Sequence, residues 1–208
     1  MYDMTPKELY FANGGQTLYI YKDGFGDQYK ATPAEEAEWR KELIEREWKR
    51  LDSETNAVSL KHLIDNLNYH NADDLVPKLV QKLDEVKPET RVVIAGCLWK
   101  ITKYKKSFSI ILNTFNVHRN NVLATVFATF QDMVGDREVA SFLLDCLEGD
   151  DAVLHQKAHT TLVMWSYMGI PQLRDGGLTD ALSPDNKIAN TEAFLKAIKT
   201  AKRLLKIR

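Results

Sequence analysis

The sequence predicts an all-α fold in which helical hairpins stack on one another, preceded by a small N-terminal extension that contains a β-hairpin. Three observations support this prediction. Apolar positions recur with a period of 32 residues, apolar residues within each repeat follow the spacing of one helix face, and two capping boxes mark helix starts near the N-terminus.

The extension covers residues 1–31 and begins with a short helix. Thr5 and Glu8 have the spacing of a capping box, with proline at the first helical position. The stretch from Thr17 to Tyr21 is rich in β-branched and aromatic residues, and a Gly preceded by Asp follows it at residues 23–24. This pattern predicts a β-hairpin whose return strand ends near Tyr29.

The rest of the chain, residues 32–208, is predicted to be one helical array, so that array and extension together form one compact domain. A second capping box at Thr32 and Glu35 starts a long charged helix that reaches about Leu51. A shorter helix follows, with its apolar stripe at Leu60, Leu63, Ile64 and Leu67. We expect these two helices to form an irregular first repeat.

Three copies of the 32-residue repeat come next. Each copy holds two stripes with i, i+3, i+4, i+7 spacing, so each predicts a helical hairpin that can bury its apolar faces only against its neighbours. The aligned positions of the first helices are Val76, Phe108, Ala140; Leu79, Ile111, Leu143; and Leu83, Phe115, Leu147. Those of the second helices are Ile94, Val126, Ala158; Leu98, Phe130, Leu162; and Ile101, Met133, Trp165.

The segment TRVVIAGCLWKI, residues 90–101, is therefore predicted to be a second helix and not a buried strand leading into a nucleophile turn. Gly96 and Cys97 fall at repeat positions that Ala128 and Thr129 fill in the next copy. Small residues at these positions would let neighbouring helices approach closely. We expect Cys97 to pack as a small apolar group.

Pro77 in LVPKLVQKL and Arg91 in PETRVVIAGCLWKI carry a resemblance to HEAT repeats of the Armadillo-like class. The similarity covers about residues 55–168 and implies a right-handed α-α superhelix whose second helices line the concave face. It also implies that side chains of these helices outside the core stripe contact a partner. They are Trp99, Lys100, Lys103, Gln131, Asp132, Met164 and Tyr167. Trp99 has a second interpretation, as ordinary packing between helices.

The C-terminal part begins with a connection of two prolines and a Gly-Gly pair, residues 169–190, in which only LTDAL has a helical pattern. Asn190 then caps a last helix with its apolar stripe at Phe194, Ile198, Ala201 and Leu205. This helix is predicted to cap the array with a basic outer face. Its basic residues are Lys196, Lys199, Lys202, Arg203, Lys206 and Arg208.

His155 and His159 have the i, i+4 spacing at which two imidazoles can share a metal. They lack the glutamate of a zinc-protease motif, and no third ligand lies nearby in the sequence. In the repeat alignment His155 takes the place of Arg91, so the alternative is polar packing against an acidic group in an adjacent turn. The metal interpretation would make the protein a metal-dependent enzyme.

Charges are sorted along the chain although the net charge is only −1. Residues 90–131 contain basic but no acidic side chains, whereas seven acids face one base in residues 132–151. Such blocks form either a solvated surface or a docking surface that complements a partner. The near-zero net charge argues against a global attraction to nucleic acid or membranes.

The function predicted from these features is non-enzymatic protein–protein binding, of the kind found in a bacterial regulatory or immunity-type protein. We expect a soluble cytoplasmic protein without cofactor and without a membrane partner, because phosphate-binding glycine loops, secretory leaders and long apolar runs are not found in the sequence. The alternative is nucleic-acid binding, since some HEAT-like alkylpurine DNA glycosylases are similar in size and helical stacking. The basic residues between Arg91 and Arg119 and the last helix would then contact phosphates.

Overall fold

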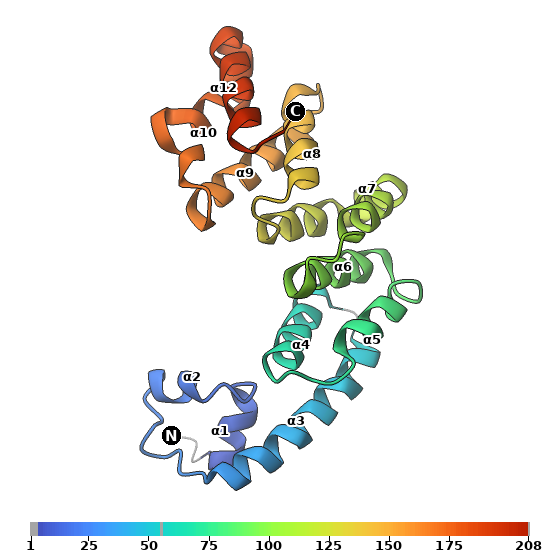
Figure 1. The fold of residues 1–208 in the computed structure, drawn as a ribbon, viewed down its shortest axis with the longest axis vertical. Coiled ribbons are helices and arrows are strands. Elements are labelled where there is room, and N and C mark those ends of the chain that lie inside the picture. Colours follow the sequence, from blue (N-terminus) through green and yellow to red (C-terminus); the bar gives the residue numbers. More distant parts are fainter. Residues whose placement is uncertain (1–3, 55, 208) are drawn as a thin grey trace. The chain divides into compact units, whose positions relative to one another are not determined.

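The computed structural model describes residues 4–54 and 56–207, and all regular secondary structure within these ranges is helical (Figure 1). The predicted all-α class is therefore confirmed. The chain divides into two compact units, Met1–Glu85 and Val86–Arg208, which are described separately. No helix in the described ranges combines the length and apolar content needed to cross a lipid bilayer.

The N-terminal unit starts with α1 (Pro6–Ala12), α2 (Thr17–Lys22) and α3 (Pro33–Ser53). Both predicted capping boxes are present: Thr5 and Thr32 each accept a backbone N–H three residues later, and the glutamates reciprocate. These backbone hydrogen bonds lower the pKa of Glu8 and Glu35. A small core joins the three helices and consists of Leu9, Tyr10, Ile20, Tyr29 and Leu43.

The predicted β-hairpin in the extension is wrong, because Thr17–Lys22 forms helix α2. Gly24 has φ +82° and ends this helix, with the Phe25 N–H donating to the Ile20 carbonyl at 3.0 Å. Asp23 keeps a φ of −82°, which a two-residue hairpin turn of type I′ would not allow. The same Asp-Gly pair that suggests a hairpin turn therefore serves here as a helix stop.

The N-terminal unit continues with α4 (Ala57–Tyr69) and α5 (Leu75–Lys82). The predicted stripe of α4 is fully buried, and α4 packs against α3. The Lys82 ammonium lies 2.9 Å from the Asp52 carboxylate and so ties the end of α5 to the end of α3. Glu47 is buried on α3 and is held by the guanidinium groups of Arg46 and Arg50.

The C-terminal unit begins with α6 (Pro88–Thr102) and α7 (Ser107–Asp132). Although α7 is continuous over 26 residues, His118 has non-helical angles (φ −125°, ψ 31°). The rings of Phe108 and Phe130 lie 6.1 Å apart, whereas a straight helix would separate these residues by about 33 Å. The helix therefore reverses near His118, and its two halves form the second predicted hairpin.

The third predicted hairpin consists of α8 (Arg137–Glu148) and α9 (Ala152–Met168). It packs on the second half of α7, where the Trp165 indole N–H donates to the Phe130 carbonyl at 2.9 Å. The second helices of successive copies also meet at Gly96 of α6, where an added Cβ would lie 2.3 Å from the Thr129 methyl group. This contact confirms the predicted close approach of helices at the small residues.

Burial follows the 32-residue period in both units. Of the aligned apolar positions, only Val76, Phe108 and Ile101 are half-buried, and all others are buried. The first predicted hairpin extends over both units, since α5 belongs to the N-terminal unit and α6 to the C-terminal unit. The predicted boundary at residues 31–32 stays a prediction.

The chain after α9 contains two 3₁₀ turns (Pro171–Leu173 and Asp175–Gly177), α10 (Leu178–Ala181), α11 (Pro184–Ala189) and α12 (Thr191–Leu204). LTDAL is helical as predicted. The predicted loop is wrong at residues 184–189, which form α11. The sequence signal for the start of this helix is Ser183 at the N-cap with Pro184 in the first turn. The predicted stripe of α12 is buried, and Asn190 caps the helix; Arg208 lies outside the described residues.

We expect Gly96→Ala to lower the free energy of unfolding by about 1–2 kcal/mol, because the clash with Thr129 outweighs the gain of about 1 kcal/mol in helix propensity. Thr129→Ser removes the methyl group, so Gly96→Ala should be neutral or stabilising in that background. Urea denaturation of the four proteins of this double-mutant cycle measures the coupling, and additive effects would contradict the close contact.

Candidate functional site

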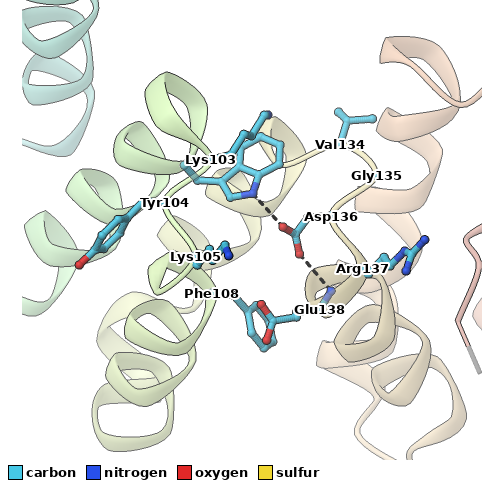
Figure 2. A pocket seen from close by; sticks show the side chains of 10 residues that line it. Lys103, Tyr104, Lys105, Phe108, Val134, Gly135, Asp136, Arg137 and Glu138 are labelled. Atoms are coloured by element: carbon cyan, nitrogen blue, oxygen red, sulfur yellow. Dashed lines mark hydrogen bonds between the residues drawn. The ribbon is translucent and has the colours of Figure 1, made fainter. Parts of the chain in front are cut away.

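A groove of about 560 Å³ lies in the C-terminal unit, between the end of α6 with its following loop and the start of α8 with its preceding loop (Figure 2). Trp99 and Lys103 line it from α6, and Phe108 lines it from the first turn of α7. Val134 and Asp136 line it from the connection between α7 and α8. The groove thus lies where the end of the first hairpin meets the starts of the second and third.

Apolar side chains form the floor of the groove. Trp99, Phe108 and Val134 are all half-buried, so each combines a packed part with an exposed part. The Phe108 ring is fixed from behind by the rings of Phe130 at 6.1 Å and Phe142 at 6.4 Å. This packing makes the floor rigid before any ligand arrives.

The Asp136 carboxylate connects the two sides of the groove. One oxygen accepts the Trp99 indole N–H at 2.8 Å. The other accepts the backbone N–H groups of Glu138 at 3.0 Å and Val139 at 3.1 Å, which makes Asp136 the N-cap of α8 (Figure 2). One side chain therefore fixes both the orientation of the indole and the first turn of the helix.

Lys103 covers the Trp99 ring, with its ammonium nitrogen 3.2 Å from the ring centroid. This is a cation–π contact on a partly exposed surface. Lys103 is also the C-cap residue of α6 and has φ 53°, a left-handed conformation that costs a non-glycine residue roughly 1–2 kcal/mol. Backbone strain of this kind is concentrated at binding sites in folded proteins.

The rim of the groove carries Lys105, Arg137 and Glu138, all exposed. Among the described residues, none of the three forms an ion pair. In Figure 2, Lys105 lies on the side of α6 and α7, Arg137 lies on the side of α8, and Asp136 lies between them. The groove therefore combines an apolar floor with a charged margin.

The structure brings two of the predicted contact residues, Trp99 and Lys103, together in this groove. The other five are placed elsewhere on the described surface. Lys100 is exposed on α6, Gln131 and Asp132 are half-buried at the end of α7, and Met164 and Tyr167 are exposed on α9.

Asp136 and Phe108 were not predicted as site residues, and Lys105 was predicted only within the basic stretch of the nucleic-acid alternative. A signal for Asp136 was present, because an aspartate after Gly135 and before a helical stripe is a typical N-cap. Its second partner, Trp99, lies 37 residues earlier and could not be inferred from that pattern.

A second groove, of about 510 Å³, lies in the N-terminal unit between α3 and the connection from α4 to α5. Its aromatic residue is the half-buried Trp48, and the Lys78 ammonium lies 4.1 Å from the ring centroid. The Arg40 guanidinium at its edge donates to the His70 carbonyl. Basic residues (Arg40, Lys41, Lys78) and acidic residues (Glu45, Asp73, Asp74) balance each other here.

The two histidines of α9 bind backbone carbonyls. His155 Nε2 lies 3.2 Å from the Leu182 oxygen, and His159 Nε2 lies 2.9 Å from the Thr179 oxygen. A carbonyl oxygen only accepts, so each Nε2 carries the proton. The prediction that His155 pairs with an acidic group is wrong. Both histidines instead bind carbonyl oxygens and so attach the segment around α10 to α9. No group of three or more metal-ligating side chains is present within residues 4–54 and 56–207.

The thiol of Cys146 is not placed for thiolate chemistry. Cys97 and Cys146 are buried, and burial raises the pKa of Cys146 to about 12, with nearby Asp145 and Asp151 adding to the shift. A thiol with this pKa remains protonated at neutral pH.

Comparisons with protein-family models, with curated proteins and with solved structures give no match to this chain.

We expect Asp136→Ala to lower the free energy of unfolding by about 2 kcal/mol, because it removes both the α8 cap and the acceptor of the indole. Asp136→Ser keeps a cap but is too short to reach Trp99, so it should cost only about 1 kcal/mol. Chemical denaturation followed by circular dichroism compares the variants. Equal losses for both would show that the cap contributes nothing.

His155 predicts a pH dependence of stability. Burial lowers the pKa of His155 below its ordinary value, with Lys187 and His159 acting in the same direction against the carbonyl hydrogen bonds. As the pH falls below about 6.5, the unfolded chain binds a proton that the folded chain takes up only at lower pH, so the free energy of unfolding decreases. For one titrating proton, the free energy of unfolding can change by at most about 1.4 kcal/mol per pH unit.

His155→Gln keeps a donor for the Leu182 carbonyl but does not titrate, so its stability should fall less than that of the wild type between pH 7.5 and 5.5. Thermal denaturation at several pH values measures the difference. The matched control is His62→Gln at an exposed position on α4, which should retain the wild-type slope. An unchanged slope in His155→Gln would contradict the prediction.

Proposed function

We propose that this chain is a non-enzymatic protein-binding module that holds its partner through the groove around Trp99. The main support for this proposal is the Trp99 side chain. It is half-buried, donates a hydrogen bond to Asp136 at 2.8 Å and is exposed toward the groove. Tryptophan side chains in partly enclosed pockets provide much of the binding energy of protein interfaces. An indole that is already oriented loses little conformational entropy when a partner docks.

A protein interface needs more area than this groove provides. The exposed end of α9 extends it, with Met164, Tyr167 and Met168. This end adjoins the groove, because a Cβ on Gly169 would lie 3.1 Å from a methyl group of Val134 in the groove lining. The contact residues predicted on α6 and α9 thus belong to neighbouring parts of one unit, which supports a common surface.

The repeat architecture also supports this proposal. In the C-terminal unit the second helices pack on one another through Gly96 with Thr129 and through Trp165 with Phe130. We propose that this stacking is a HEAT-like, right-handed superhelix with its second helices on the concave face. In such arrays a rigid curved surface is preformed for partner proteins.

The nucleic-acid alternative receives less support from the charges. Arg119, the last residue of the basic stretch, forms an ion pair with Asp151, and Lys202 of α12 pairs with Glu148 at 2.7 Å. These side chains are already occupied within the chain, which lowers the positive charge that phosphates would meet.

A photocrosslinking experiment tests the proposed function. A photoreactive phenylalanine analogue replaces Tyr104 at the groove or, as a control, Lys199 on the exposed face of α12, in cells that carry the gene. We expect a discrete protein adduct from position 104 that disappears when Trp99→Ala is added. No adduct at position 104, or the same adducts from both positions, would contradict binding through the groove.

A further inference from the structure

The groove carries more uncommitted positive charge than negative charge. Both oxygens of Asp136 are used by the indole and by the first turn of α8. Three basic side chains, Lys103, Lys105 and Arg137, still face two acidic ones, Asp136 and Glu138, and only Glu138 lacks hydrogen bonds of this kind. An incoming segment therefore meets an excess of ammonium and guanidinium groups, which favours a ligand with carboxylates.

Lys103 occupies the place on the Trp99 ring that an apolar side chain of a ligand would need. The ammonium nitrogen lies at 3.2 Å from the ring centroid, and the side chain is exposed. Such an exposed cation–π contact is weak, so a stronger partner for the ammonium can remove it from the ring. A carboxylate is such a partner, because hydrogen bonds between two charged groups are stronger than the cation–π contact.

We propose that the groove binds a short acidic segment of the partner protein, in which a carboxylate lies next to a large apolar side chain. The carboxylate pairs with the ammonium groups of Lys103 and Lys105, and the apolar side chain takes the place of Lys103 on the Trp99 ring. The rigid floor at Phe108 supports the same side chain. This inference rests on the proposed function and adds the chemistry of the ligand.

A basic ligand fits the groove less well. It would have to displace Lys103 from the ring without offering the ammonium another partner. It would also find only Glu138 as an uncommitted carboxylate, since the Asp136 oxygens already accept three N–H groups. The same arrangement therefore favours an acidic segment and disfavours a basic one.

Selection from a random dodecapeptide phage library on the full-length protein tests this inference. We expect enriched peptides in which Asp or Glu lies next to Leu, Phe or Trp, and whose capture is lost with Trp99→Ala. Enriched peptides without an excess of acidic residues, or with basic ones, would overturn the acidic ligand but leave groove binding intact. No enrichment, or enrichment unaffected by Trp99→Ala, would count against the proposed function itself.

Affinities of a selected peptide, labelled with fluorescein and followed by fluorescence polarisation, then test the two lysines. Lys103→Met keeps an apolar stem over the ring but removes the charge, and should weaken binding about 3- to 10-fold. Lys105→Glu should weaken it at least as much, and both effects should shrink as salt is raised. Lys199→Glu on α12 is the control with the same charge change. Equal affinity in Lys103→Met and wild type would overturn the role of Lys103.

Discussion

The C-terminal unit depends on one cluster of aromatic rings around Phe142. The Phe142 ring from α8 lies between 5.6 and 6.4 Å from the rings of Phe130, Phe115, Phe127 and Phe108, which come from both halves of α7. Each such pair contributes about 0.5–1.5 kcal/mol beyond the burial of area. The cluster keeps α7 folded back at His118 and seats α8 against it. The start of α7 and the start of α8 are the two sides of the groove, so the binding surface follows from this core.

The sequence could predict the helices and their buried faces because these depend on a periodic pattern. Leu79, Ile111 and Leu143 are buried at one repeat position since each copy must hide the same stripe. Local sequence signals gave a wrong prediction where the same residues are compatible with two different structures. The Asp-Gly pair at residues 23–24 suits a hairpin turn and a helix stop equally, and burial of Ile20 against Tyr10 and Leu43 decided for the helix.

The candidate site could be predicted only in part, for a related reason. Trp99 lies in the last turn of α6 and Lys103 is the residue that ends this helix, so they are close in space because they are close in the sequence. Asp136 reaches Trp99 through the packing of one hairpin on the next, and this depends on the angle between helices. The two charge blocks also meet in space, where Arg119 pairs with Asp151, so a surface that is bipolar along the sequence is partly neutralised in the fold.

The segment after α9 packs on α8 and α9, the helices of the third hairpin. Lys187 of α11 donates to the last carbonyls of α8, those of Leu147, Glu148 and Gly149, and α10 and α11 contact α9. In the proposed helical stack, a segment packed at this edge competes with a second copy of the chain for the same surface, which would oppose open-ended association into fibres.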